Sequence, residues 1–324
     1  MSSVTNAPPS GQSPAAAAQV AVVGAGLIGR AWALVFARGG VPVRAFDPQP
    51  RARAAVRAWI DETLADLAEF GLIDEPVQAI AARVTVCDRL EDALRDADYV
   101  QENIVEQLEP KQALFATLAQ HTGERTVLAS SSSYIPISAM TRGLPQADRC
   151  LIAHPVNPPH LVPLVEICPS KSTAGWAIDA AFALHAAVGQ VPIRVKRELE
   201  GFILNRLQSA LLAEAMRLID RDCVSVEDLD KTLKDGLALR WSFMGPFETI
   251  DLNAPEGAAD YFTRYSPTMQ RLALELVGRW SAQAEQRVAG DRRAALPANE
   301  LAQRARWRDR RLMALLAHKR GQPR

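Results

Sequence analysis

The sequence predicts an α/β protein with a doubly wound parallel sheet, followed by a smaller all-helical domain. Short apolar runs typical of buried parallel strands alternate with helical patterns in the first part of the chain. A glycine-rich segment, residues 24–29, lies between the first apolar run and the first helical pattern. Beyond Val195 the patterns are helical only. The 324 residues are enough to bury the cores of two domains.

The first elements form a βαβ unit. A strand is expected at residues 20–23, an apolar run that ends at Gly24. A helical pattern follows at residues 28–38, and the glycines at 39 and 40 end it. The second strand is expected at residues 41–46. This order of strand, helix and strand indicates a parallel sheet.

The remaining elements follow the same reasoning. Residues 51–70 are expected to be helical because Ala54, Ile60, Leu64 and Leu67 lie on one apolar stripe. Further β-like runs occur at residues 84–86, 99–100, 127–128 and 150–152. Later helical patterns occur at residues 201–221, 225–235, 268–289 and 298–318.

These patterns divide the chain into three parts. Residues 1–18 carry Ser, Pro, Gly and Ala without periodicity, so we expect a disordered tail. Residues 19–195 form the predicted sheet domain. Residues 196–324 form the predicted helical domain, which we expect to bind substrate and to mediate dimerisation.

The composition argues against several classes of partner. Lys+Arg and Asp+Glu are 37 each, so there is no net charge to favour nucleic acid or an anionic membrane surface. No run of about 18 apolar residues could span a bilayer. The four cysteines are widely scattered, without metal-ligand spacing, as expected of reduced thiols. With no recognisable secretory signal, we expect a cytoplasmic protein without a metal site.

The glycine-rich segment matches the fingerprint of Rossmann-like dinucleotide-binding domains. Gly24 permits a tight turn, Gly26 lets a pyrophosphate approach the backbone, and Gly29 allows close packing of helix and strand. The phosphates would then lie at the positive end of the helix. A glycine-rich turn without a ligand is the alternative, but the flanking strand and helix favour dinucleotide binding.

Asp47 indicates which dinucleotide is bound. It follows Gly29 by 18 residues, at the end of the second strand. A carboxylate there can accept hydrogen bonds from the ribose hydroxyls and would repel a 2′-phosphate, which favours NAD over NADP. Arg51 and Arg53 nearby are the counter-argument, because an arginine can accommodate that phosphate.

A histidine and a glutamate are candidates for proton transfer. His154 directly follows a predicted strand, at the edge where open α/β sheets bind ligands. Glu166 lies 12 residues later within apolar sequence, and a buried carboxylate needs a partner. Pairing across a hairpin would fix the imidazole tautomer and raise its basicity. A structural histidine in a proline-rich turn is the equally weighted alternative.

Two other segments carry polar groups near the expected site. Four serines at residues 130–133 follow a predicted strand, and one of them could bind a substrate hydroxyl. Asn205 opens the helical domain within residues 201–206 and could reach the cleft. A solvated loop and a cap at the domain junction are the alternatives for these two segments.

Together these motifs resemble the 3-hydroxyacyl-CoA dehydrogenase family, from about residue 19 to near the end of the chain. The fingerprint, the serine run, His-Pro-x-Asn-Pro-Pro, the glutamate at plus twelve and Gly-Phe-x-x-Asn-Arg occur in the family's order. The resemblance implies an NAD-dependent oxidation of a secondary alcohol with a dyad of His154 and Glu166. It also implies substrate contacts from Ser133, Asn157 and Asn205, and cofactor contacts from Leu27, Ile28, Glu106 and Lys111.

Within the family, residues 236–249 are most similar to the λ-crystallin branch, whose enzymes are L-gulonate 3-dehydrogenases. The expected reaction is therefore oxidation of L-gulonate to 3-dehydro-L-gulonate. A sugar acid has a carboxylate that must be paired, and Arg240 is the candidate. The alternative for Arg240 is a surface charge at a helix end.

Other substrates and roles remain open. A 3-hydroxyacyl-CoA such as 3-hydroxybutyryl-CoA could place its phosphates on Arg51, Arg53 and Arg57. L-Carnitine dehydrogenases share a similar run, and Trp241, Phe243 and Phe247 could surround a trimethylammonium group. A crystallin-like structural role without catalysis is a further alternative. The resemblance also implies a homodimer, although the stripe formed by Leu207, Leu211, Ala215 and Leu218 fits an intrachain core equally well.

Overall fold

The computed structural model describes residues 18–322, and the expected tail at 1–18 lies outside this range except for Ala18. Contacts divide the chain into two units. The first contains the residues up to Asn205 together with those from Ala305 onward, and the second contains Arg206–Arg304.

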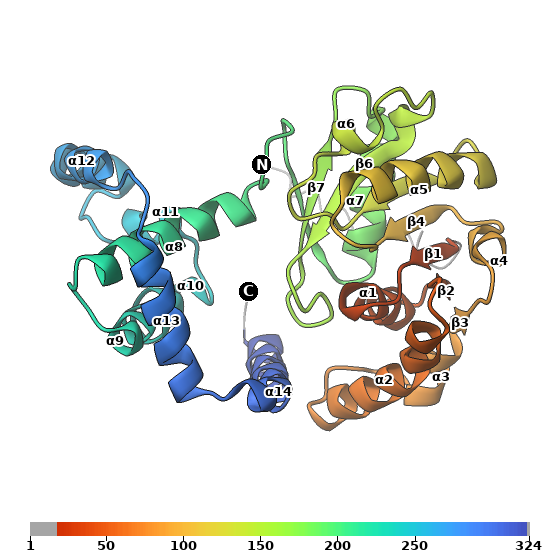
Figure 1. Ribbon diagram of the computed structural model, residues 1–324, viewed down its shortest axis with the longest axis horizontal. Coiled ribbons are helices and arrows are strands. Elements are labelled where there is room, and N and C mark those ends of the chain that lie inside the picture. Colours follow the sequence, from red (N-terminus) through yellow and green to blue (C-terminus); the bar gives the residue numbers. More distant parts are fainter. Residues whose placement is uncertain (1–17, 323–324) are drawn as a thin grey trace, which may run out of the picture. The chain divides into compact units, whose positions relative to one another are not determined.

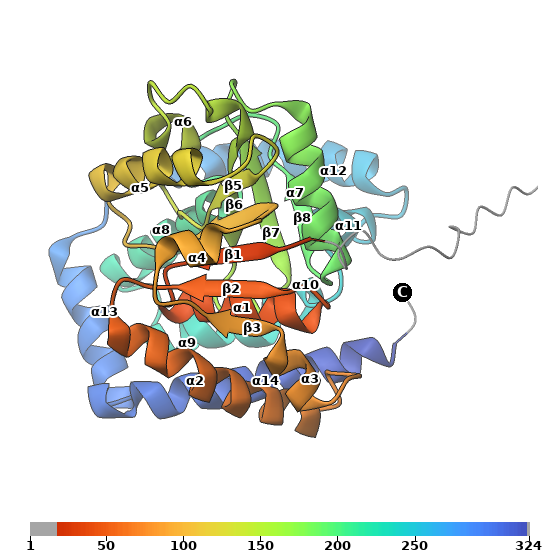
Figure 2. The same ribbon diagram turned by 90° about the vertical axis from the view of Figure 1, so that its right-hand side faces the viewer.

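The first unit contains an eight-stranded sheet in the order β3-β2-β1-β4-β5-β6-β7-β8. Neighbouring strands are parallel except β6 and β7, which are antiparallel. Figure 2 shows β3, β2 and β1 side by side. The strands are β1 Val20–Val23, β2 Val43–Phe46, β3 Val84–Val86, β4 Tyr99–Glu102, β5 Val127–Ser130, β6 Cys150–Pro155, β7 Leu164–Pro169 and β8 Val191–Arg194.

Helices cover both faces of this sheet, which explains the continuous apolar runs of its central strands (Figure 1). In β1, Val20 and Val22 belong to one core cluster, and Ala21 and Val23 belong to the other. Helices α1 Leu27–Arg38, α2 Pro50–Glu69, α3 Val77–Ala82 and α7 Gly175–Ala187 contribute to the first cluster. Helices α4 Leu90–Leu94, α5 Leu108–His121 and α6 Ile137–Met140 contribute to the second. The predicted α/β fold with a doubly wound sheet is confirmed.

The described residues beyond Val195 form helices and no strand. They are α8 Leu204–Asp220, α9 Val226–Lys231, a π-helical turn Thr232–Leu237, α10 Ala238–Trp241, α11 Pro246–Asp251, α12 Ala258–Glu275, α13 Ala282–Ala295 and α14 Leu301–Arg320. The single helix expected at residues 268–289 is wrong, because α12 ends at Glu275 and α13 begins at Ala282. Gly278, with φ +110°, lies in the break, and the Ser281 hydroxyl accepts from the Ala284 N–H to cap α13.

The end of the chain returns to the sheet-containing unit, which the sequence analysis did not anticipate. The contact boundary follows Asn205 instead of residue 195, and the residues from Ala305 onward leave the helical unit. The physical reason is packing: Met313 is buried in the first core cluster, and Leu312 and Leu316 pack against it. Arg310 also pairs with Asp66 of α2.

Two buried histidines give this unit a defined response to acid. Burial lowers the pKa of His185 from 6.5 to about 3. Burial, together with the charges of Arg38, Arg308 and Arg30, lowers the pKa of His160 to about 3 as well. Both side chains are therefore neutral in the folded protein at pH values where the unfolded chain binds a proton.

We expect the stability of the first unit to fall as the pH drops from about 6.5 toward 3, because unfolding takes up protons in that window. Above pH 6.5 both histidines are neutral in the folded and in the unfolded chain, so they add no pH dependence to the stability of the first unit. Each histidine contributes a slope of up to about 1.4 kcal/mol per pH unit. Thermal unfolding between pH 7.5 and 5 should show a smaller decrease in Tm for His185→Gln than for the parent. Replacing the exposed His121 with Gln should leave the parent's decrease, and an equal decrease in all three proteins would contradict the assignment.

Candidate active site

The glycine-rich segment forms the turn between β1 and α1. Gly24 has φ +90°, and a Cβ built on it would lie 2.8 Å from the backbone carbonyl carbon and oxygen of Asn103. A Cβ on Gly29 would lie 1.7 Å from the carbonyl oxygen of Gly24. A Cβ on Gly26 would meet no described atom within 4 Å. The turn is therefore tightly packed at Gly24 and Gly29, and open at Gly26, as the approach of a phosphate requires.

The first turn of α1 is suited to an anion. Gly26 caps the helix and has no side chain to accept from its N–H groups, and the first turn contains no acidic residue. Leu27 and Ile28 supply backbone N–H groups that have no acceptor within the helix. Partial positive charge at this end of the helix fits the pyrophosphate of a dinucleotide.

Asp47 directly follows β2 and lies at the same turn. Its carboxylate accepts from the backbone N–H of Ala25 at 2.8 Å and from that of Gln49 at 2.8 Å. Arg53 donates to the carbonyl oxygen of Asp47 at 2.7 Å and pairs with Asp88 at 3.3 Å. Because Arg53 already has these partners, its side chain is less available to bind a 2′-phosphate.

Lys111 lies inside the protein. Its side chain is 1% exposed, and its ammonium donates to both carboxylate oxygens of Glu102, at 2.8 and 2.9 Å. Glu102 also accepts from the Ser130 hydroxyl at 2.5 Å and from the Ile104 N–H at 2.6 Å. Lys111 thus orders the segment that leads to Glu106, and its expected contact with the cofactor stays a prediction. Glu102 was not among the expected site residues, although a glutamate at the end of a buried strand was a usable signal.

Glu106 holds the serine loop, which we define as residues 130–135. One carboxylate oxygen accepts from the Ser132 hydroxyl at 2.6 Å and from the backbone N–H groups of Ser133 at 2.9 Å and Tyr134 at 3.0 Å. Burial opposes ionisation of Glu106, but these bonds and the charge of Lys111 outweigh it and lower its pKa below the ordinary value. The ionised carboxylate therefore shapes the loop.

The four serines have different environments. The hydroxyl of Ser130 donates to Glu102, that of Ser131 to the Asn103 side chain, and that of Ser132 to Glu106. Within residues 18–322, the Ser133 hydroxyl has no such partner and is half-buried. Ser133 is therefore the serine whose hydroxyl is available to another molecule, and its expected contact with the substrate stays a prediction.

His154 and Glu166 face each other across the only antiparallel strand pair of the described sheet. The register of β6 and β7 places them opposite one another, and His154 Nδ1 lies 2.8 Å from a Glu166 carboxylate oxygen. The other oxygen accepts from the backbone N–H groups of Ile203 at 2.8 Å and Leu204 at 3.0 Å. Both side chains are buried. Since Nδ1–H donates to the carboxylate, the lone pair of His154 Nε2 is left to accept a proton.

The other expected site residues have different positions. The Asn205 side chain donates to the carbonyl oxygen of Ser133 at 2.9 Å, so these two residues are brought together. Asn157 is exposed and precedes a cis proline. Arg240 is exposed on α10, in the second unit. The structure of the first unit thus unites Ser133, Asn205, His154 and Glu166 near one sheet edge, and the role of Arg240 stays a prediction.

Among residues 18–322, no group of three or more His, Cys, Asp or Glu side chains could hold a metal ion. No helix in the same range has the length and apolar character needed to cross a membrane. Cys87, Cys150 and Cys168 are buried free thiols, and Cys223 is exposed.

Comparison with known proteins adds to this geometry. The pattern described as 3-hydroxyacyl-CoA dehydrogenase, NAD binding domain, matches residues 19–198, and that of the C-terminal domain matches residues 201–287. The chain is 40% identical over 306 residues to the lambda-crystallin homolog of Mus musculus, covering 93% of this chain and 96% of that protein. It is 36% identical over 312 residues to the L-carnitine dehydrogenase of Nocardiopsis dassonvillei, covering 93% and 92% respectively.

A solved structure is also similar over nearly the whole chain. It is that of 5-formyl-3-hydroxy-2-methylpyridine 4-carboxylic acid 5-dehydrogenase, described as an NAD⁺ dependent dismutase. The TM-score is 0.80 at 27% sequence identity, and the similarity covers 94% of this chain and 99% of the other.

The two glycines of the turn should respond differently to an added methyl group. Gly26→Ala should fold with an unchanged Tm but bind NADH at least about 10-fold more weakly, because its Cβ would occupy the space that a phosphate needs. Gly29→Ala should lower the Tm, because its Cβ would overlap the carbonyl oxygen of Gly24. Thermal unfolding and NADH fluorescence titration measure both effects. Unchanged NADH affinity in Gly26→Ala would refute this position for the phosphates.

Proposed function

The chain belongs to the 3-hydroxyacyl-CoA dehydrogenase family, which oxidises CH–OH groups with NAD, and from this premise we propose that it oxidises L-gulonate to 3-dehydro-L-gulonate. The observation that carries the proposed chemistry is the buried pair of His154 and Glu166, in which Nε2 keeps a lone pair. A neutral imidazole with a fixed tautomer is the group that a general base requires.

In the proposed mechanism, His154 Nε2 takes the proton of the substrate's 3-hydroxyl. NAD, when bound, supplies the acceptor for the hydride. Glu166 stabilises the imidazolium that forms, and the Ile203 and Leu204 N–H groups hold its other oxygen in place. General-base assistance of this kind contributes about 10²–10⁴-fold to the rate.

Ser133 and Asn205 would hold the reacting oxygen. The Asn205 amide has a second N–H besides the one that donates to the Ser133 carbonyl, and the Ser133 hydroxyl is available. Two donors fixed by Glu106 and by the start of α8 would orient the alcohol before reaction. We place Asn157 beside the same reacting centre. On the cofactor side we assign Leu27, Ile28, Asp47 and Glu106.

The substrate assignment is supported by the similarity to the lambda-crystallin homolog and by the λ-crystallin-like segment at residues 236–249. We assign Arg240 to the substrate carboxylate. The second candidate is L-carnitine, favoured by the relative named L-carnitine dehydrogenase and by the exposed aromatic rings of Trp241, Phe243 and Phe247. A CoA thioester and a purely structural role are further outcomes that the experiments below distinguish.

We also propose a homodimer formed through the second unit. Leu207 and Leu211 of α8 are exposed, so the stripe that they begin does not serve as an intrachain core there. Phe247 and Leu274 of the same unit are 77% and 78% exposed. Apolar surface of this extent indicates an interface, and a second copy of the chain is the occupant that symmetry favours. The free cysteines support a cytoplasmic location.

The dyad is tested by two substitutions. His154→Ala should lower kcat by about 10²–10⁴-fold, because the base is lost. Glu166→Gln should do the same, because its amide N–H₂ would face Nδ1 and move the imidazole proton to Nε2. NADH affinity, measured by fluorescence titration, should remain within about twofold of the parent. Loss of NADH binding in His154→Ala, or unchanged kcat, would contradict the assigned role.

The substrate is tested by NADH formation with L-gulonate, L-carnitine, L-3-hydroxybutyrate and 3-hydroxybutyryl-CoA. We expect the highest kcat/KM with L-gulonate. Arg240→Ala should raise the KM for L-gulonate by about 10–100-fold, which is the loss of affinity expected when a charge-assisted hydrogen bond is removed. Arg271→Ala, another exposed arginine of the second unit, serves as the control. A higher kcat/KM with carnitine or the thioester would make that compound the substrate in place of L-gulonate. Absence of turnover despite NADH binding would favour a structural role.

A further inference from the structure

A series of buried and half-buried polar side chains crosses the first unit from α7 to the glycine-rich turn, and the proposed mechanism does not use it. Its members are His185, Tyr99, Gln101, Ser131 and Asn103. His185, Tyr99 and Gln101 are at most 2% exposed. Polar groups at such depth must find partners within the protein, and their bonds are correspondingly constrained.

The first half of this series has only one possible direction of donation. Gln101 Nε2 lies 3.2 Å from the carbonyl oxygen of Ala153, which can only accept, so Gln101 must present its oxygen to Tyr99. The Tyr99 hydroxyl donates to that oxygen at 3.0 Å. The hydroxyl oxygen must then accept from His185 Nε2, 2.9 Å away. His185 Nδ1 is left as a buried lone pair without a partner.

The second half is equally constrained. Ser131 Oγ accepts from Gln101 Nε2 at 2.7 Å and from the Trp32 indole N–H at 3.0 Å. Its own proton must therefore be donated to Asn103 Oδ1, at 2.7 Å. The Asn103 amide donates to the carbonyl oxygens of Gln101 at 2.8 Å and Val23 at 3.4 Å. Donation thus runs from His185 through Tyr99, Gln101 and Ser131 to Asn103 without a break.

The series ends between the glycine-rich turn, which is the proposed cofactor site, and the serine loop. The backbone of Asn103 limits the space at Gly24, and its amide nitrogen lies 3.4 Å from a Cβ built on Gly29. Ser131 lies in the serine loop, two residues before Ser133. The bond between Ser131 and Asn103 therefore connects the cofactor turn with the loop that carries the proposed substrate-binding serine.

We propose that His185, Tyr99, Gln101 and Ser131 are positioning residues. Their side chains form a hydrogen-bond chain with a single direction of donation, which fixes the position of the serine loop relative to the glycine-rich turn. The chain sets the distance between the cofactor and the alcohol through Asn103 and Ser133. This inference rests on the proposed function for the role of Ser133 only. Its effect on the cofactor turn is independent of the substrate.

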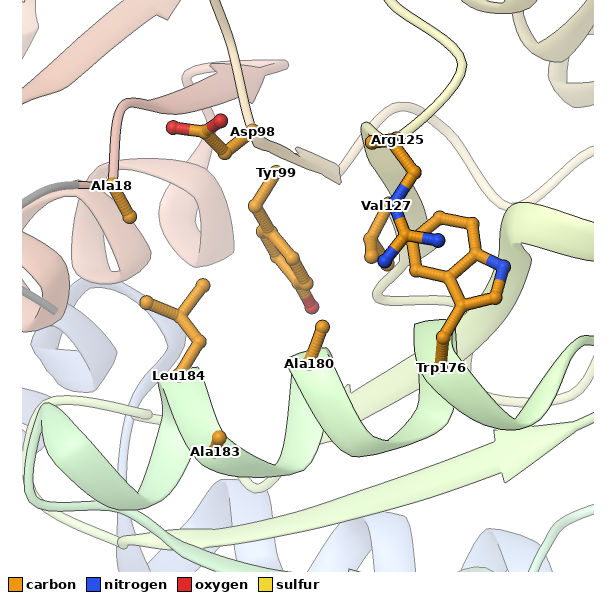
Figure 3. Close-up of a pocket in the computed structure, with 9 residues that line it drawn as sticks. All are labelled: Ala18, Asp98, Tyr99, Arg125, Val127, Trp176, Ala180, Ala183 and Leu184. Atoms are coloured by element: carbon orange, nitrogen blue, oxygen red, sulfur yellow. The ribbon is translucent and has the colours of Figure 1, made fainter. Parts of the chain in front are cut away.

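Tyr99 offers a conservative test. Figure 3 shows its ring beside a cavity of about 270 Å³, with the hydroxyl directed toward α7. Tyr99→Phe keeps the ring and the cavity wall but removes the hydroxyl that connects His185 with Gln101. Ser131→Ala removes the next hydroxyl, which lies between Gln101 and Asn103. Thr63→Val is the matched control, because Thr63 is a buried hydroxyl of α2 that donates only to the Trp59 carbonyl oxygen.

The experiment is a double-mutant cycle read by NADH fluorescence titration, at a temperature well below the Tm of each variant. Tyr99→Phe and Ser131→Ala should each raise the Kd for NADH by about 3–10-fold. The double variant should show little more than the larger single effect, because both changes break one chain. Thr63→Val should leave the Kd within about twofold. With an accepted substrate, kcat should also fall by about 10-fold in each single variant, with the same non-additivity.

Two results would overturn the inference. One is a parent-like Kd for NADH in Tyr99→Phe and Ser131→Ala when only the Tm is lowered, which would make the chain purely structural. The other is multiplication of the two effects in the double variant, which would show independent sites. Neither result depends on turnover. A wrong assignment of L-gulonate would appear as absent turnover in the parent enzyme, and it would leave the NADH titrations of the variants unaffected.

Discussion

The carboxyl group of Glu166, which is 0% exposed, is the constraint on which the proposed catalytic region depends. A polar group at such depth needs hydrogen-bond partners from within the protein. Here the donors come from separate parts of the chain: the His154 imidazole on β6, and the Ile203 and Leu204 N–H groups at the start of α8. Satisfying Glu166 therefore fixes the imidazole tautomer and also anchors the chain as it leaves the sheet. The antiparallel pairing of β6 and β7 makes this possible, because it places residues 154 and 166 directly opposite each other.

Two further carboxylates organise the neighbouring loops by the same principle. Glu102, at the end of β4, binds the buried Lys111 ammonium and the Ser130 hydroxyl, and so connects β4, α5 and β5. Glu106 gathers N–H groups of the serine loop, which would otherwise lack acceptors. Since each carboxylate accepts several hydrogen bonds, substitution of either one would leave more than one donor without its partner. This concentration of acceptors lets irregular backbone keep a defined shape at the edge of a sheet.

The strand order explains why these loops meet the dinucleotide-binding turn. Strands β2 and β4 flank β1 on opposite sides, so the chain connections diverge at the carboxyl ends of these strands, where open α/β sheets bind their ligands. Gly24 and Asn103 follow β1 and β4 and lie directly beside each other there. The serine loop follows β5, the next strand along. Cofactor turn, Asn103 and serine loop are thus neighbours because of the sheet topology, and the hydrogen-bond chain through Gln101 and Ser131 adds a side-chain connection between them.

The sequence by itself determined the features that depend on local spacing. These are the βαβ unit with its glycine turn and the helical character beyond Val195. For His154 and Glu166, 12 positions apart, the sequence left pairing and a structural histidine as equal alternatives, and the antiparallel register of β6 and β7 places the two residues opposite one another. Only the tertiary structure decided which of four chemically identical serines keeps a free hydroxyl, and that Lys111 is enclosed with Glu102. It also decided that the residues from Ala305 onward pack on the first unit. The physical reason is the same in each case: the deciding partner is distant in sequence, so no local pattern of apolar or polar residues can identify it.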